Sequence, residues 1–237
     1  RRQRQMCIRD RTNTAFATGL RIRAPGCSLR GLVFQFFYTG VYLDFGSDNS
    51  VIENCYFGTD ATGTACGGNL GDGLDICSNN NRIGGIAPGT ANIMACNGYA
   101  GIGLYCGTNN VIQNNYIGTN PDGANLGNEF IGIEVDDSNN TIGGAAAGAG
   151  NTIAFNGGPG IAIFFGVGNS IRGNSIHSNS GLGIDIDGNG VTANDPGDGD
   201  GGPNRRQNFP ELTAASSSSG NTIILGTFNS LPTHSYS

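Results

Sequence analysis

The sequence predicts an all-β fold, a parallel β-helix of about seven coils, and two observations support this. First, a glycine followed by apolar-x-apolar recurs seven times, at steps between 21 and 33 residues. An apolar residue at every second position is the pattern of a short strand with one buried face. Second, no segment sustains the i, i+3, i+4 apolar pattern of a helix, and the steps are too short for helical crossovers. Strands repeated in this way predict a solenoid in which each coil contributes the same inward positions.

The first strand of each coil begins at one of the seven glycines. In chain order these are Gly19, Gly40, Gly73, Gly101, Gly132, Gly160 and Gly183. The apolar pairs that follow them are Leu20/Ile22, Val41/Leu43, Leu74/Ile76, Ile102/Leu104, Ile133/Val135, Ile161/Ile163 and Ile184/Ile186. We expect these pairs to stack, coil over coil, into one continuous interior.

A second strand of the coil is marked by isoleucines in matching places, Ile52, Ile83, Ile112, Ile142 and Ile171. Two residues before each of them stand Ser50, Asn81, Asn110, Asn140 and Asn169. Asparagine tolerates left-handed backbone and suits a corner that recurs in every coil. Stacked at the strand spacing of about 4.8 Å, each amide can bond the next. We therefore predict a structural ladder of side chains at this corner.

A longer repeat of two coils carries a resemblance to known proteins. The segment Asn49–Asp60 (NSVIENCYFGTD) matches Asn109–Asn120 (NNVIQNNYIGTN), and each is followed by a longer loop, Gly58–Asp72 and Gly118–Phe130. These repeats, together with the ending that contains Asn194-Asp-Pro-Gly-Asp198, resemble the right-handed parallel β-helix repeats of large bacterial extracellular proteins, which share the pectate-lyase-like superfold. The resemblance implies a right-handed helix from a secreted or cell-surface bacterial protein, and the chain is expected to be part of a longer exported one. It implies no single activity, because this fold hosts enzymes, adhesins and inert stalks.

We expect four regions along the chain. They are a basic lead-in or cap (1–18), the β-helix (19–190), an acidic Gly/Asp/Pro loop with a C-terminal cap (191–215), and a hinge followed by the start of a further β segment (216–237). Eight of the twelve arginines lie in residues 1–30, and the rest carries 17 acids against four arginines. Such an acidic body repels nucleic-acid phosphates. The sequence contains no run of about 18 apolar residues, so it predicts no membrane-spanning helix.

The seven cysteines form no C-x-x-C pair of the metal-binding or redox type. Cys77 and Cys106 occupy neighbouring places in adjacent coils, so they are candidates for a disulfide. Cys55 and Cys66 are a second candidate pair, which would close the loop that follows. The alternative is a set of buried thiols, since free cysteine is a good small core residue.

The outward positions of the first strands read as a strip of carboxylates with intervening aromatic residues. The candidate ligand-binding residues are Tyr42, Asp44, Asp75, Tyr105, Glu134, Asp136 and Phe164. Aromatic faces cover the C–H surfaces of sugars, and carboxylates accept bonds from hydroxyl groups. Three interpretations stay open: a solubilising surface, a polysaccharide-binding surface, and a catalytic one with paired carboxylates. Of the polygalacturonase-type motifs on this fold only an Asp-Asp pair, Asp136-Asp137, is present, and we assign no catalytic residue.

An acidic stretch near the end of the solenoid suggests a structural calcium ion. The candidate metal ligands are Asp185, Asp187, Asn189, Asp195, Asp198 and Asp200. The first three form D-x-D-x-N-G, the first half of a calcium loop, but the twelfth position is Pro196 and this is not an EF-hand. Crowded carboxylates favour a hard divalent ion, which would cap the last coil. The alternative is a mobile acidic loop.

Taken together, these patterns favour a non-catalytic extracellular scaffold that binds polysaccharide or neighbouring proteins. One alternative is a polysaccharide lyase, glycoside hydrolase or epimerase. Another is a stalk or fibre module whose coils associate end to end.

Overall fold

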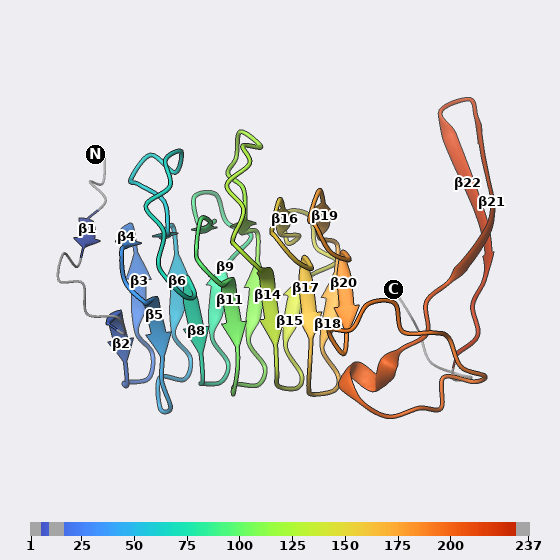
Figure 1. Ribbon diagram of the computed structural model, residues 1–237, viewed down its shortest axis with the longest axis horizontal. Coiled ribbons are helices and arrows are strands. Elements are labelled where there is room, and N and C mark those ends of the chain that lie inside the picture. Colours follow the sequence, from blue (N-terminus) through green and yellow to red (C-terminus); the bar gives the residue numbers. More distant parts are fainter. Residues whose placement is uncertain (1–5, 10–16, 231–237) are drawn as a thin grey trace.

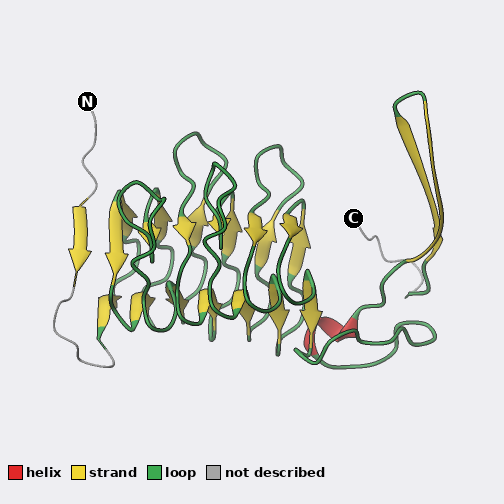
Figure 2. Ribbon diagram, turned by 45° about the horizontal axis from the view of Figure 1, so that its top comes forward, coloured by secondary structure: helices red, strands yellow, loops and turns green. Residues whose placement is uncertain are grey.

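The chain winds into a right-handed parallel β-helix, as its computed structural model shows for residues 6–9 and 17–230 (Figure 1). Each coil contributes one strand to each of three parallel sheets, which we number in the order in which a coil visits them. Figure 2 shows the strands as stacked rows along the long axis of the molecule. The predicted fold class is therefore confirmed.

Sheet 1 contains the seven predicted first strands. They are β2 (Thr18–Ile22), β5 (Thr39–Leu43), β8 (Leu74–Ile76), β11 (Ala100–Leu104), β14 (Ile131–Val135), β17 (Ile161–Ile163) and β20 (Ile184–Ile186). The predicted apolar pairs are aligned in register from β2 to β20. Most of their side chains, including those of Val41, Leu74 and Ile133, are fully buried in one core. The continuous interior is confirmed.

Sheet 2 contains the strands predicted from the repeated isoleucines, and sheet 3 was not predicted. Sheet 2 consists of β3 (Ser28–Arg30), β6 (Val51–Glu53), β9 (Arg82–Gly84), β12 (Val111–Gln113), β15 (Thr141–Gly143) and β18 (Ser170–Arg172). Sheet 3 consists of β1 (Met6–Arg9), β4 (Leu32–Gln35), β7 (Tyr56–Phe57), β10 (Ile93–Met94), β13 (Tyr116–Ile117), β16 (Thr152–Ala154) and β19 (Ser175–His177). Several sheet 3 strands have only two residues, too few to show alternation in the sequence.

Asparagine ladders run along all three corners of the coil, whereas the sequence predicts a ladder at only one corner. The predicted ladder, between sheets 1 and 2, links Ser50, Asn81, Asn110, Asn140 and Asn169 through amide oxygens that accept from the backbone N–H groups of the preceding coil. A second, between sheets 2 and 3, links Asn92, Asn115, Asn151 and Asn174. A third, between sheets 3 and 1, links Asn69, Asn97, Asn128, Asn156 and Asn179.

The left-handed residues at the first corner are not the ladder residues themselves. Asn49, Asn80, Asn109 and Asn139 have positive φ, and each directly precedes a ladder residue. The two properties of asparagine are thus divided between neighbours: one turns the chain, and the next bonds along the helix axis.

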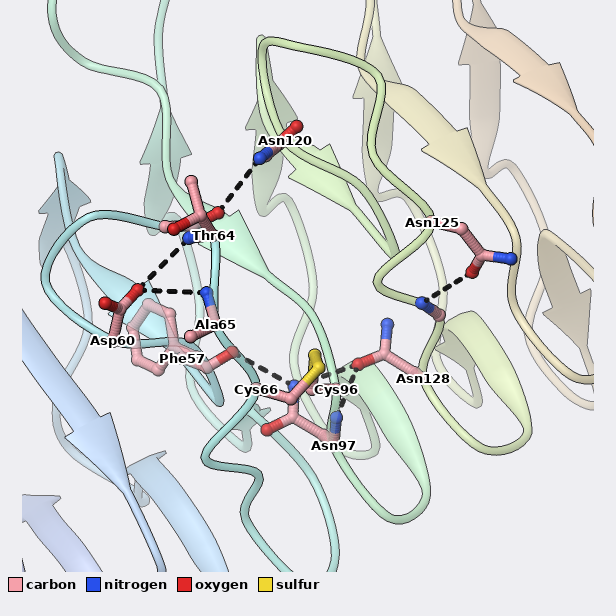
Figure 3. Close-up of a disulfide and its surroundings, with 12 residues drawn as sticks. Phe57, Asp60, Thr64, Ala65, Cys66, Cys96, Asn97, Asn120, Asn125 and Asn128 are labelled. Carbon is pink, nitrogen blue, oxygen red and sulfur yellow. Dashed lines mark hydrogen bonds between the residues drawn. A yellow bond between two sulfur atoms is a disulfide. The ribbon is translucent and has the colours of Figure 1, made fainter.

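The two long loops emerge on the same side of the solenoid, between sheets 3 and 1 (Figure 1). The Asn120 amide of the second loop donates to the Gly63 carbonyl of the first at 3.1 Å. A disulfide between Cys66 and Cys96 ties the first loop to the next coil, beside the Asn97–Asn128 bond of the third ladder (Figure 3).

The predicted disulfide between Cys77 and Cys106 is confirmed, and the pairing of Cys55 with Cys66 is wrong. Cys55 stands at the ladder position before β7 and points into the core, away from the loop. Burial raises the pKa of its thiol to about 11, so it is an inert core residue. Cys27 is also a free thiol, and the side chain of Cys7 lies outside the described residues.

Beyond β20 the chain forms a cap and a hairpin. A short 3₁₀ helix, η1 (Pro203–Arg206), packs at the end of the solenoid (Figure 2). There the Asn204 amide oxygen accepts from the Asn169 N–H at 2.8 Å and so ends the first ladder. The antiparallel strands β21 (Glu211–Ser218) and β22 (Asn221–Thr227) project away from the body (Figure 1). The hinge expected at Ser216–Gly220 is instead the end of β21 and the hairpin turn, because this serine-rich segment pairs with β22.

Two further expectations concern residues that are only partly described. The basic lead-in, apart from β1 and residues 17–18, lies outside the described residues, as does the segment 231–237. Within the described part of the chain, no helix is long and apolar enough to cross a membrane.

Candidate functional site

The predicted strip lies on the outer face of sheet 1, where neighbouring coils align its residues in two rows. The first row reads Arg21, Tyr42, Asp75, Gly103, Glu134, Ala162 and Asp185. The second, two residues further along each coil, reads Arg23, Asp44, Cys77, Tyr105, Asp136, Phe164 and Asp187. The structure therefore places all seven candidate ligand-binding residues on one face, but it separates them into three groups.

At the N-terminal end of the face, an ion-pair cluster neutralises the carboxylate of Asp44. The guanidinium groups of Arg21 and Arg23 approach Asp44 Oδ2 at 2.8 and 2.7 Å. Hydrogen bonds from Arg21 and then Arg23 lower the pKa of Asp44 to about 2. Arg21 also lies over the Tyr42 ring, 4.9 Å from its centroid. The candidate residues Tyr42 and Asp44 are thus both engaged by arginines of the protein. The carboxyl groups without an arginine partner begin at the next coil, with Asp75.

The centre of the face is formed by a carboxylate–tyrosine cluster, which we define as Asp72, Asp75, Tyr99, Tyr105 and Glu134. Only 7% of Asp72 is exposed. Its Oδ1 accepts from the Ala100 N–H at 2.8 Å and its Oδ2 from the Tyr105 hydroxyl at 3.1 Å. The same hydroxyl lies 3.4 Å from Glu134 Oε2. One tyrosine hydroxyl therefore stands between two carboxyl groups from different coils.

The carboxyl groups of Asp72 and Asp75 are hydrogen-bonded to each other, which requires a proton on one of them. Burial, followed by the charge of Asp72, raises the pKa of Asp75 to about 8, and burial also raises that of Asp72. Asp75 Oδ2 accepts from the Thr39 hydroxyl at 3.1 Å, whereas its buried Oδ1 receives no hydrogen bond from the described residues. The raised pKa of Asp75 marks it as the protonated partner, which donates to Asp72.

The ring of Tyr105 packs against Gly103, the residue that aligns between Asp75 and Glu134. A side chain on Gly103 would occupy the place of the ring, so glycine here lets the hydroxyl reach its two carboxyl partners. Burial raises the pKa of Tyr105, and the charges of Asp72 and Glu134 raise it further. The phenol stays protonated and acts as a hydrogen-bond donor.

Tyr99 and Glu134 form the side of the cluster toward the C-terminus. Burial, then the charge of Glu134, raises the pKa of Tyr99 to about 12, and its hydroxyl bonds to Glu134. Burial raises the pKa of both Glu134 and Asp136. The Tyr99 ring also lies 5.7 Å from the Phe130 ring at the base of the second long loop. The cluster thus combines partly exposed tyrosines with the partly exposed Asp75 and the buried Asp72 and Glu134.

Beside the cluster the face carries an apolar patch, and the last coil beyond it is acidic again, with Asp185 and Asp187. Ala100, Ile131 and Ala162 are buried on it, with the rings of Tyr99 and Phe164 packed against them. Phe164 therefore covers the sheet and adds aromatic surface next to the cluster.

A shallow hollow of about 420 Å³ lies near the cluster, at the corner between sheets 3 and 1. The Cys66–Cys96 disulfide, Leu70 and Glu129 line it, and Leu70 precedes Asp72 by only two residues. The long loops thus border the same side of the face.

Three residues of this site were not among the candidates. Asp72 and Thr39 directly precede the opening glycines of their coils, and Tyr99 lies two residues before Gly101. The strip was predicted by counting forward from each glycine. Strand alternation assigns the residue before each glycine to the inner face, so the periodicity of the sequence carried no signal for Asp72 and Thr39.

The predicted metal ligands fall into two separate groups. Carboxylate oxygens of Asp195, Asp198 and Asp200 lie within 4.8 Å of one another. The buried Oδ1 atoms of Asp195 and Asp200 have no hydrogen-bond partner among the described residues. Asp198 accepts from the Asn208 N–H at 2.8 Å and from the Ser230 hydroxyl at 2.5 Å.

The other three predicted ligands are engaged elsewhere. Asp187 forms an ion pair with Arg206 at 2.5 Å, and Asp185 accepts from the Gly190 N–H at 3.2 Å. Asn189 is exposed. The structure thus gathers only the second half of the predicted set.

Comparison with known proteins gives no relative: no family model, no curated protein and no solved structure matches the chain.

Proposed function

We propose that this chain is a non-catalytic scaffold of an exported bacterial protein and that the outer face of sheet 1 binds polysaccharide. The observation that carries the proposal is the carboxylate–tyrosine cluster, in which the partly exposed Tyr99 and Tyr105 lie against the buried carboxyl group of Glu134. Sugars are bound by this combination of flat apolar surface and directed acceptors. The parallel coils present it on a long, rigid face.

Two disulfides support the exported location. Both join residues of different coils, and such bonds persist in oxidising compartments rather than in the cytosol.

The experiment is affinity electrophoresis of the purified chain in gels that contain neutral or acidic polysaccharides. We expect a neutral polysaccharide to retard the wild-type chain. Tyr99→Ala and Glu134→Gln should lose most of this retardation. The matched variants Tyr116→Ala and Glu53→Gln, on sheets 3 and 2, should keep it. Equal retardation of all four variants would show that the face is not the binding surface, and partner proteins would then be the remaining ligand class.

Glycoside hydrolysis is a second candidate function, and one observation favours it. The proton shared by Asp72 and Asp75 provides an acid at neutral pH, and Glu134 contacts the same tyrosine hydroxyl as Asp72. Paired carboxyl groups of this kind cleave glycosidic bonds. However, the Tyr105 hydroxyl occupies the space between them. New reducing ends after incubation with polysaccharide would support hydrolysis, and unsaturated uronates would indicate a lyase; binding without either product supports the scaffold.

We further propose that Asp195, Asp198 and Asp200 hold a structural calcium ion. Three carboxylates in close proximity, two of them with unpartnered buried oxygens, are hard ligands of the kind that calcium prefers. The ion would fix the loop between the last coil and the hairpin.

End-to-end association of the solenoid stays a prediction. Strands β19 and β20 end their sheets and each leaves one edge unpaired within the described sheets. Light scattering over a concentration series measures whether copies associate.

A further inference from the structure

The carboxylate–tyrosine cluster brings three carboxyl groups together, and none of the ion pairs among the described residues reaches them. Asp72 directly precedes the coil of β8, Asp75 lies on β8, and Glu134 lies two strands further along the sheet, on β14. Hydroxyls of Thr39, Tyr99 and Tyr105 donate hydrogen bonds to these carboxyl groups. The ion pairs on this face lie at its ends, Arg21 and Arg23 on Asp44 and Arg206 on Asp187. The central carboxyl groups therefore depend on a proton, not on a cation, to offset their repulsion.

The groups that face Asp75 come from every strand packed around it. Tyr42 and Asp44, with the arginines bound to Asp44, lie on and after β5 on one side. At the start of its own strand, β8, Asp75 is hydrogen-bonded to Asp72. On the other side stand Tyr105 after β11 and Glu134 on β14, with Asp136 beyond it. Apart from the arginines held by Asp44, all of these groups are acids or phenols.

The backbone beneath Tyr105 is fixed, so that only its side chain is free to move. The next residue, Cys106, is bonded to Cys77 of the preceding coil, two residues after Asp75. The ring rests on Gly103, whose lack of a side chain leaves the sheet flat at this point. The position of the Tyr105 ring therefore depends on the hydrogen bonds that the Tyr105 hydroxyl makes to Asp72 and Glu134.

We propose that the proton shared by Asp72 and Asp75 is a latch that holds Tyr105 on the sheet, and that its loss in mildly alkaline solution lifts the ring and abolishes polysaccharide binding. This inference rests on the proposed function of the face. With the proton present, Asp75 donates to Asp72 and the Tyr105 hydroxyl is stabilised between Asp72 and Glu134. Without it, three adjacent carboxylates repel one another, and the neutral hydroxyls of Thr39, Tyr99 and Tyr105 bond them without offsetting their charge. The carboxylates then separate toward solvent and carry the ring off Gly103.

The test measures the solvent accessibility of Tyr105 by hydroxyl-radical footprinting with mass spectrometry, at pH 6 and pH 9.5. Labelling of Tyr105 in the wild-type chain should rise about threefold or more relative to Tyr56 and Tyr116 of sheet 3, whose constant labelling shows that the solenoid stays folded. Asp75→Asn retains a donor toward Asp72 and cannot ionise, so its Tyr105 labelling should stay low at both pH values. Gly103→Ala displaces the ring directly, so its labelling should be high at both.

Electrophoresis in polysaccharide gels at the same two pH values separates the latch from the proposed function. We expect wild-type retardation at pH 6 and its loss at pH 9.5. If Tyr105 labelling rises but no polysaccharide retards the chain at pH 6, the binding function is overturned and the latch stands. If retardation is present and Tyr105 labelling is the same at both pH values, or rises equally in Asp75→Asn, the latch is overturned and the binding function stands.

Discussion

The ring of Tyr105 rests on Gly103 so closely that a methyl group on Gly103 would lie 2.3 Å from a carbon of the ring. Gly103→Ala should therefore force the ring away from Asp72 and Glu134. Overpacking of this kind lowers the free energy of unfolding by about 1–3 kcal/mol. We expect a lower Tm and weaker retardation by polysaccharide.

The matched control is Gly183→Ala, at the start of β20 in the same sheet. A methyl group there would have its nearest neighbour at 3.6 Å, an ordinary contact. Its Tm should stay close to that of the wild type. Equal losses in the two variants would contradict the packing of Tyr105 on Gly103.

The pH dependence of stability follows from the raised pKa of Asp75. Its pKa is about 8 in the folded chain against an ordinary 3.8, so the folded state keeps a proton that the unfolded state releases. The stabilisation from this group is complete below about pH 4 and is lost as the pH rises through about 8. Asp75→Asn, which cannot ionise, should unfold at a higher urea concentration than the wild type at pH 9.

The difference between Asp75→Asn and the wild type should grow from pH 5 to pH 9, by at least about 1.4 kcal/mol, the equivalent of one pKa unit. Asp122→Asn, at an exposed position of the second long loop, is the control and should follow the wild-type profile. Parallel profiles for Asp75→Asn and the wild type would show that Asp75 ionises in the ordinary range.

Asn128 and Asn125 stand three residues apart in one loop but differ in their bonding (Figure 3). Asn128 donates to the Met94 carbonyl and to Asn156, and accepts from Asn97. Asn125 is exposed and accepts one long bond at 3.4 Å. Asn128→Ala leaves buried partners unsatisfied and should cost about 3 kcal/mol. Asn125→Ala should change stability by less than about 0.5 kcal/mol. Urea unfolding measures both, and similar costs would remove the ladder as a source of stability.

The calcium site predicts a cation-dependent Tm. Calcium should raise the Tm of the wild-type chain above its value in chelator, because an ion that binds only the folded state stabilises it by mass action. Asp195→Asn should reduce this difference, whereas Asp122→Asn should leave it intact. An unchanged Tm with and without chelator would exclude the ion.

Much of the fold follows from the sequence because every coil repeats the same inward positions. The pairs behind Gly73 and Gly132 carry a clear alternation, and so their strands, β8 and β14, could be placed from sequence alone. The strands of sheet 3 could not, since β7 and β10 each have two residues and only Phe57 and Met94 point inward.

The site was predicted in outline but not in detail. The outward direction of the Asp75 and Glu134 side chains follows from strand alternation, which depends only on neighbouring residues in the sequence. The neutralisation of Asp44 by Arg21 depends on which coil lies next to which, and so does the contact of Tyr105 with Asp72. Cys66 shows the same limit: its partner Cys96 is 30 residues away, at a corner that becomes adjacent only when the coils stack.

An NMR titration of the isotope-labelled chain with the polysaccharide that retards it shows directly which face of the solenoid binds. We expect the amide signals that shift most to belong to β8, β11 and β14 and to Tyr99 and Tyr105. Signals from β9, β12 and β15 of sheet 2, in the same coils, should stay in place. Shifts confined to sheet 2, or to the β21–β22 hairpin, would contradict the account.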